Sequence, residues 1–289
     1  MNNEGISPYI RLAVDSIIGT PWNLKERVIF DYELLYVKEG KALITVENDS
    51  YSAQAGDVFL FKPKKKHSIC AWGGSCFRQP HIHFDLFYLE DSPEVRISFR
   101  PFEQMTDADI SLFREDVTKE GIFELPDKLS IRNVKYFEQC IFEIIEEFQS
   151  KKPFYEFAVK GLFIKLWTYI LRENFWSRNP VVLSNIDELN KIKNYLDFHT
   201  GREISLDELA GEFKISKYHL NRLFKKAFGV APIHYHQAVR MEKIKEAIQY
   251  TGTSMTEIAE RFGFNSINAF SRAFRNAEGV PPSFYRNRG

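Results

Sequence analysis

The sequence of 289 residues has little cysteine, no long hydrophobic run and no net charge. Its three cysteines are odd in number and show no paired metal-binding spacing, which predicts reduced thiols at Cys70, Cys76 and Cys140. The most apolar stretch, residues 157–171, is interrupted by two lysines, which argues against a membrane span. The N-terminus lacks a basic start followed by an apolar run, so no signal peptide is expected and a cytoplasmic protein is predicted.

The zero net charge conceals a division along the chain. Residues 1–183 contain 23 Lys and Arg against 27 Asp and Glu, a net charge of −4, and residues 184–289 contain 16 against 12, a net charge of +4. An acidic front part and a basic tail favour an anionic partner for the tail. With 44% hydrophobic residues, the chain is long enough for two domains, each with its own core.

The front half begins with short segments of strand-forming residues. Between about residues 28 and 62, apolar and polar residues alternate, and turn residues separate the segments. Two further strand candidates are 67–72 and 81–89. Short strands at close spacing predict a small antiparallel barrel or sandwich.

The hydrophobic period becomes helical in the middle of the chain. Residues 134–149 place their apolar side chains on one stripe, and a second helical segment covers 154–174. The segment 175–185 contains Pro180, which is expected to end the order there, so this segment is interpreted as a linker. The predicted fold class is multidomain α+β, in three parts: a β-rich domain with two helices over 1–174, a linker over 175–185, and an all-α domain over 186–289.

The tail contains an internal repeat. "RLFKKAFGVAPIHY" (222–235) matches "RAFRNAEGVPPSFY" (272–285) at an offset of 50 residues. Upstream, "LDELAGEF" (206–213) matches "MTEIAERF" (255–262) at an offset of 49. Each copy consists of a short helix, a turn and a second helix, so the repeat predicts two helix-turn-helix modules.

The two modules are predicted at 205–228 and 255–277, and the segment 233–251 between them predicts a single helix. A helix of about 19 residues spans roughly 28 Å, close to the ~34 Å between major grooves on one side of DNA. Lys214 stands in the first turn where the second repeat has Gly263. If this position needs a positive φ, the lysine costs ~1 kcal/mol and the first turn is expected to be irregular.

The second helix of each module combines an apolar face with a polar one. In a helix-turn-helix protein this helix enters the major groove, where Arg binds guanine, Asn binds adenine and Lys neutralises phosphate. The alternative is a pair of amphipathic helices with solvated polar faces. The candidate DNA-contacting residues are Lys217, Tyr218, Asn221, Arg222, Lys225 and Lys226 in the first module, and Ile267, Asn268, Ser271 and Arg272 in the second.

Over residues 186–285 the tail resembles the DNA-binding domain of the AraC/XylS family of bacterial transcription regulators. The resemblance is most specific in "EIAERFGFNSINAFSRAFRNAEGVPPSFYR". Ile267 stands where relatives often have a polar residue, so contact with a thymine methyl group is expected there. The resemblance implies base contacts by Tyr218, Asn221 and Arg222 in the first module, and by Asn268, Ser271 and Arg272 in the second.

The front half resembles the cupin-type sensor barrel found in many members of this family. The matching features are Gly40 after a strand, "AGD" at 55–57, Pro63 and His67. The resemblance implies a small-molecule effector inside the barrel and a dimer formed through the two helices that follow it. The candidate effector-binding residues are Glu33, His67, Trp72, His81 and His83.

A cupin metal site is incomplete in this sequence. Glu33 falls seven residues before Gly40, as the family glutamate does, but Arg27 and Ile29 stand where cupin enzymes have histidines. No metal ligand, cofactor or catalytic residue is therefore predicted. An alternative stays open: His81 and His83 share one face of a strand, and with Glu33 and His67 they can form a different nitrogen and oxygen site.

The predicted function is that of a ligand-responsive, sequence-specific DNA-binding regulator rather than an enzyme. It is expected to activate carbohydrate-utilisation genes as a homodimer that contacts double-stranded DNA and RNA polymerase. A sugar effector is favoured because all four tryptophans lie in the front half or the linker. The alternatives are a cupin metalloenzyme with an accessory DNA-binding tail and a constitutive DNA-binding protein without an effector.

Overall fold

The computed structural model describes residues 5–72, 74 and 76–286 of the chain. The outer ends of the two predicted domains, residues 1–4 and 287–289, lie outside the described residues. The chain divides into two units, one that ends at Arg178 and one that begins at Asn179. Among the described residues, no helix is long and apolar enough to cross a membrane.

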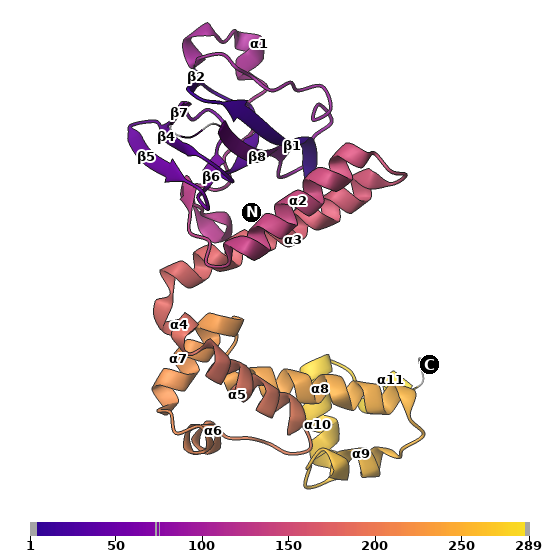
Figure 1. Cartoon of the computed structure of the whole chain (residues 1–289). Helices are drawn as coiled ribbons and strands as arrows, with labels where there is room; N and C mark the ends of the chain where they lie inside the picture. Colours follow the sequence, from indigo (N-terminus) through magenta and orange to yellow (C-terminus); the bar gives the residue numbers. More distant parts are fainter. Residues whose placement is uncertain (1–4, 73, 75, 287–289) are drawn as a thin grey trace. The chain divides into compact units, whose positions relative to one another are not determined.

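Two sheets of antiparallel strands form the β-rich part of the first unit (Figure 1). The strands are β1 (Tyr9–Gly19), β2 (Trp22–Arg27), β3 (Tyr32–Tyr36), β4 (Lys41–Val46), β5 (Asp49–Gln54), β6 (Val58–Phe61), β7 (His67–Trp72), β8 (Cys76–Asp85) and β9 (Lys128–Leu129). One sheet has the order β1-β8-β3-β6-β9, and the other has the order β2-β7-β4-β5. The antiparallel double sheet expected from the spacing of the short strands is confirmed.

The first two strands were not predicted from the sequence. β1 pairs with β8 over its whole length, but the register shifts between Ile10 and Leu12. This shift breaks the alternation of buried and exposed residues that identifies a strand in a sequence. The connection from β8 to the first long helix is mostly irregular, with short turns at η1 (Phe102–Gln104), α1 (Asp107–Ile110) and η2 (Gly121–Phe123).

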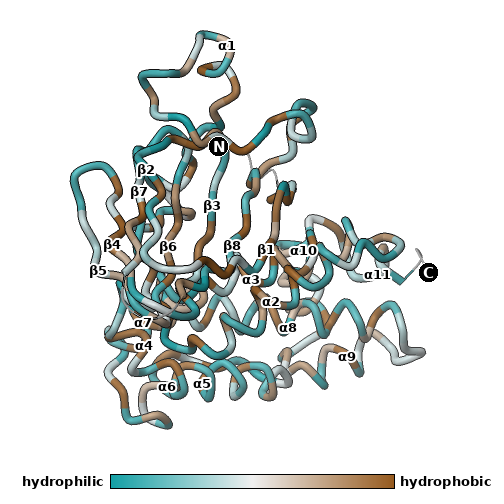
Figure 2. The backbone as a smooth tube through the Cα atoms, turned by 45° about the horizontal axis from the view of Figure 1, so that its top comes forward, coloured by the Kyte–Doolittle hydropathy of each residue, from teal (hydrophilic) through white to brown (hydrophobic). Residues whose placement is uncertain are grey.

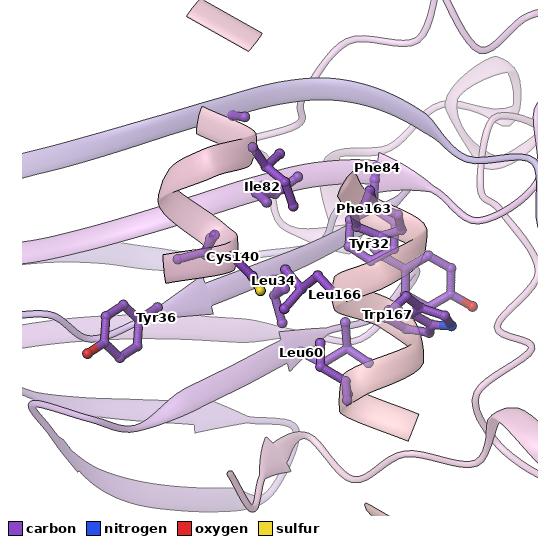
Figure 3. Close-up of a cluster of buried hydrophobic side chains, with 14 of the residues drawn as sticks. Tyr32, Leu34, Tyr36, Leu60, Ile82, Phe84, Cys140, Phe163, Leu166 and Trp167 are labelled. Atoms are coloured by element: carbon purple, nitrogen blue, oxygen red, sulfur yellow. The ribbon is translucent and has the colours of Figure 1, made fainter. Parts of the chain in front are cut away.

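Alternation along β3 separates two cores, because this strand is buried on both faces. Leu34 and Tyr36 pack toward α2 (Val134–Ser150) and α3 (Tyr155–Arg178) in the cluster shown in Figure 3. Leu35 belongs instead to the cluster between the two sheets. Glu33 lies two residues before Leu35 and therefore on the same face of β3, so its carboxylate enters the space between the sheets.

The two helices of the first unit agree with the predicted helical period. The buried side chains of α2 are Phe137, Cys140, Ile141, Ile144 and Ile145, which lie on one stripe against the larger sheet.

The segment 175–185 differs from the irregular linker that was expected. α3 continues to Arg178, and Pro180 begins the helix α4 (Pro180–Ser184), because proline is tolerated at the first position of a helix.

The second unit is built from helices. After α4 these are α5 (Ile186–Phe198), α6 (Leu206–Glu212), α7 (Lys217–Phe228), α8 (Pro232–Tyr250), α9 (Met255–Arg261), α10 (Ile267–Glu278) and α11 (Pro282–Arg286). Hydrophilic and hydrophobic residues alternate in short repeats along these helices, as amphipathic helices require (Figure 2). The helix pairs α6–α7 and α9–α10 confirm the two predicted modules, and α8 confirms the single connecting helix of 19 residues.

The two modules pack against different halves of α8. In the first module, the ring of Phe224 lies 5.8 Å from that of Tyr235, near the start of α8. In the second module, Phe270 and Phe274 share a buried cluster with Ile244 and Ile248, near its end. α8 therefore acts as a spacer that holds the two modules at a fixed separation within this unit.

The turns of the two modules have the same conformation, so the irregular first turn that was expected is not observed. Lys214 has φ = 51° and Gly263 has φ = 72°. The Lys214 amide donates to the carbonyl of Gly211, and the Gly263 amide donates to that of Glu260 in the same pattern. The turn geometry thus outweighs the preference of lysine for negative φ.

Gly263→Ala is expected to lower the free energy of unfolding of the second unit by about 2 kcal/mol or more. A Cβ atom at this position would lie 2.8 Å from the carbonyl oxygen of Gly201, in addition to the strain of positive φ. Gly211→Ala is the matched control, because nothing lies within 4 Å of its added Cβ. That control is expected to stabilise α6 by ~0.5–1 kcal/mol. Urea denaturation followed by circular dichroism measures both, and equal effects of the two variants would contradict the account.

Candidate functional site

The second helix of the first module, α7, has a buried and an exposed face. Leu220, Leu223 and Phe224 are buried at the spacing that turns one helix face inward. Tyr218, in the first turn, is 79% exposed. The other candidate contact residues of α7 are exposed as well: Lys217, Asn221, Arg222, Lys225 and Lys226.

The corresponding helix of the second module, α10, is arranged in the same way. Phe270 and Phe274 are buried against α8. Asn268 and Arg272 are exposed, Ile267 is 37% exposed, and Ser271 is half-buried. Ser216 and Ser266 accept hydrogen bonds from backbone amides at the N-termini of α7 and α10, and these caps fix the helix ends that carry the candidate contacts.

The charges on the two helices are mostly unpaired within the chain. Lys217 forms an ion pair with Asp207 of α6. Arg222 has only a long contact of 3.4 Å with His219 Nδ1. In the part of the chain that the structure describes, no carboxylate forms an ion pair with Arg222, Lys225, Lys226 or Arg272. These side chains are free to bind an anionic partner such as the DNA backbone.

A cluster of buried charged and polar side chains lies between the two sheets of the first unit. Arg27 Nη2 donates to Glu33 Oε2 at 2.6 Å, and Arg27 Nε donates to His67 Nε2 at 3.0 Å. Arg27 Nη1 donates to the carbonyl of Ser98 at 3.2 Å. Arg27 comes from one sheet and Glu33 from the other, so this side chain ties the two sheets together.

Three histidines surround Glu33, and each has its Nδ1 atom near an oxygen. His67 Nδ1 lies 3.2 Å from the carbonyl of Lys65, and His81 Nδ1 lies 2.9 Å from that of Gln79. His83 Nδ1 lies 3.2 Å from Oδ1 of Asp31. Because these oxygens accept hydrogen bonds, each Nδ1 acts as a donor, and each Nε2 is directed into the space between the sheets.

The electrostatics of the cluster fix its charge states. Burial raises the pKa of the Glu33 carboxyl, but the Arg27 guanidinium and the three histidines outweigh this effect and lower it to about 2. Burial and the positive charge of Arg27 lower the pKa of His67 to about 4. Burial also lowers the pKa of His81. At neutral pH, Glu33 is therefore ionised, and His67 and His81 are neutral.

A cavity of about 220 Å³ adjoins this cluster inside the double sheet. Glu33, His81 and His83, which the sequence proposed as effector-binding residues, line it. Arg27 also lines the cavity, and His67 is buried behind Arg27. Trp72 is 40% exposed and is not among the residues that line the cavity. The lining residues are Leu12, Ser16, Trp22, Leu24, Arg27, Glu33, Ile69, Gln79, His81, His83, Ile97 and Phe99.

Several lining residues were missed by the sequence interpretation. Arg27 was noted only as a missing histidine, because β2, the strand that it ends, was not predicted. Trp22 lies on β2, a strand that was not predicted. Ile97 and Phe99 come from the irregular connection after β8, where no periodic pattern signals an inward side chain.

Two family models match this chain. Residues 21–167 match the AraC-like ligand binding domain, and residues 209–288 match a helix-turn-helix domain. The fold and these matches define a transcriptional regulator with a ligand-binding barrel and a DNA-binding helix-turn-helix region. Because the ligand-binding match alone covers half of the chain, the chain belongs to the AraC family.

The relatives are also regulators. The uncharacterised HTH-type transcriptional regulator YisR of Bacillus subtilis is 23% identical over 90% of this chain and 87% of that protein. An uncharacterised HTH-type regulator of Staphylococcus aureus is 23% identical over 87% of this chain, which spans only 31% of that protein. Among solved structures, the C-terminal domain of AraT, a response regulator from Geobacillus stearothermophilus, is 32% identical over 35% of this chain and 84% of that chain, with a TM-score of 0.33.

Proposed function

We propose that this regulator is a cytoplasmic activator of carbohydrate-utilisation genes and that a small sugar in the barrel cavity controls it. The observation that carries this proposal is the mixed lining of the 220 Å³ cavity. Trp22 and Phe99 offer aromatic surfaces for the apolar face of a sugar ring, and Glu33, Gln79 and His81 offer hydrogen-bonding groups for hydroxyls. Arg27, where cupin enzymes have histidine, supports a binding role rather than a catalytic one.

The DNA contacts are proposed for the exposed face of each second helix. Arg222 and Arg272 stand at equivalent places in the repeat and supply the base discrimination, together with Asn221 and Asn268. Tyr218, Ser271 and Ile267 complete the base contacts, and Lys217, Lys225 and Lys226 bind phosphates. Because the modules pack against opposite halves of α8, the two helices enter successive major grooves.

A homodimer through the first unit is proposed as the functional form. Phe154 and Phe157, at the start of α3, are 79% and 74% exposed, which is unusual for side chains of this size. A second copy of the same helix pair is the partner that such a surface fits. In this arrangement, residues 175–185 transmit the effector-dependent change to the DNA-binding unit, and RNA polymerase binds the DNA-bound dimer.

The proposal is tested by thermal denaturation of the full chain against a panel of sugars, combined with gel-shift assays. A sugar that occupies the cavity raises the melting temperature by mass action and changes the affinity for operator DNA. Trp22→Ala is expected to abolish the response, whereas Trp72→Ala, on the outside of β7, keeps it. If no sugar shifts the melting temperature and DNA binding is strong without one, the protein is a constitutive binder and the proposal is wrong.

Asp207→Asn is expected to raise the affinity for DNA of any sequence by a few-fold. The substitution removes a negative charge beside α7 and releases Lys217 from its ion pair. One additional phosphate contact makes the slope of log affinity against log salt steeper by ~0.9. Fluorescence anisotropy over a salt series measures this slope.

Glu246→Gln is the matched control for this prediction, because it makes the same change in net charge. Glu246 pairs with Lys243, which is not a proposed contact residue. The control is expected to leave the slope at the wild-type value. A wild-type slope in Asp207→Asn would show that the ion pair with Asp207 does not limit the phosphate contact of Lys217.

A further inference from the structure

Three side chains with metal-binding atoms meet inside the double sheet. Glu33 on β3 pairs directly with His83 on β8, and His81 lies two residues away on the same face of β8. One ligand atom from each of the three residues lies within 4.8 Å of the others. Glu33 and His83 are buried and His81 is half-buried, so bulk water does not compete freely for these atoms.

The outer partners of the two histidines are those of metal ligands. Asp31 Oδ1 holds Nδ1 of His83, and the Gln79 carbonyl holds Nδ1 of His81. A histidine that binds a metal through Nε2 usually donates its other N–H to a carboxylate or a backbone carbonyl in this way. Arg11 in turn donates to Asp31 at 2.6 Å, so the carboxylate is fixed behind its histidine.

The distance between the inner atoms also fits a shared cation. His83 Nε2 lies 3.5 Å from Glu33 Oε2, beyond the usual length of an N–H···O hydrogen bond. Two ligands at ~2.1 Å from a zinc ion and at the tetrahedral angle lie roughly 3.4 Å apart. The distance between His83 Nε2 and Glu33 Oε2 is therefore that expected for two ligands of one zinc ion.

We propose that Glu33, His81 and His83 bind one divalent transition-metal ion, with Zn²⁺ as the representative of the class. Two imidazole nitrogens and one carboxylate oxygen suit zinc and neighbouring metals, and three protein ligands leave a coordination position open. The open position faces the 220 Å³ cavity, where water or an oxygen of the effector completes the coordination.

Arg27 is the residue that most opposes metal binding at this site. Its guanidinium binds Glu33 Oε2, and a carboxylate oxygen has lone pairs for both a hydrogen bond and a metal. Its positive charge weakens cation binding, whereas the Asp31 carboxylate behind His83 strengthens it. The balance predicts a reversible site with moderate affinity rather than a permanently filled structural one. The sequence predicted no metal ligand but left open a site of His81, His83, Glu33 and His67, and the structure brings ligand atoms of Glu33, His81 and His83 together.

Metal binding by the full chain tests the inference. The protein is treated with a chelator, dialysed and titrated with ZnCl₂ in a calorimeter. We expect one saturable equivalent per chain, a fall in affinity of at least about 100-fold in His81→Ala, and no change in His234→Ala, which removes an exposed histidine of α8. No saturable binding, or equal binding by His81→Ala and wild type, overturns the proposal.

A spectroscopic measurement on the unaltered protein covers the case in which His81→Ala fails to fold. Co²⁺ is titrated instead of Zn²⁺, and visible absorption bands of a protein-bound ion are expected at one equivalent. Absence of these bands at saturating Co²⁺ overturns the inference. The result is independent of the proposed sugar response and of DNA binding, because it is measured without either partner. A protein that responds to a sugar but shows no Co²⁺ bands keeps the proposed function and loses the metal site.

Discussion

Arg27→Met is expected to lower the free energy of unfolding of the first unit by about 3–5 kcal/mol. The substitution leaves the Glu33 carboxylate buried without its cation, since both side chains are almost completely buried in the structure. It also removes the donors to His67 and to the Ser98 carbonyl. All four tryptophans belong to the first unit, so tryptophan fluorescence in a urea titration reports the unfolding of this unit alone.

The double variant Arg27→Met with Glu33→Leu is the control for this prediction. Replacing a buried ion pair by apolar side chains of similar size is often close to neutral, because both desolvation penalties disappear together. The double variant is therefore expected to recover most of the stability that the single variant loses. If it is no more stable than Arg27→Met, the loss comes from packing and not from an unpaired charge.

Arg222→Ala and Arg272→Ala are each expected to weaken binding to the operator by about 1–3 kcal/mol, or roughly five- to 150-fold. Both side chains are exposed on the second helix of their modules and lack a carboxylate partner among the described residues. The loss is expected to be specific: affinity for unrelated DNA changes much less, because base contacts and not phosphate contacts are removed. Quantitative gel shifts with operator and unrelated DNA measure the ratio.

Two controls separate base contacts from general electrostatics. Arg275→Ala removes the same charge from the exposed surface of α10, outside the proposed contacts, and is expected to leave the specificity ratio unchanged. Lys226→Ala is expected to weaken binding to all sequences equally and to reduce the salt slope by ~1. Unchanged operator specificity in both Arg222→Ala and Arg272→Ala would place the base contacts elsewhere.

The helical half of the fold was predictable from the sequence, because its signals are local. The repeat located both modules, and the buried positions of α7 and α10, such as Leu223 and Phe274, follow from a single period. The turn at Lys214 was less predictable. Its backbone adopts the same positive-φ conformation as the Gly263 turn, although lysine prefers negative φ.

The first unit was predictable only in part, because the residues that contact one another in it are distant in the sequence. Alternation placed His81 and His83 on one face of a strand, and the cupin resemblance supplied Glu33; the structure gathers all three around one cavity. The same alternation explains the position of Trp72: it shares its parity on β7 with exposed Cys70, whereas Ile69 and Ala71 are buried. The link from Arg27 to Ser98 joins residues 71 positions apart, which no local pattern indicates.

A hydroxyl-radical footprint of the full chain on its operator tests the central claim, that α7 and α10 read two successive major grooves from one polypeptide. The account predicts two protected patches on one face of the DNA, about 10 base pairs apart for each bound chain. At a saturating protein concentration, the Arg222→Ala variant is expected to lose the protection of one patch. The Arg272→Ala variant is expected to lose the protection of the other. A single patch per chain, or two patches that both persist unchanged in the two variants, would contradict it.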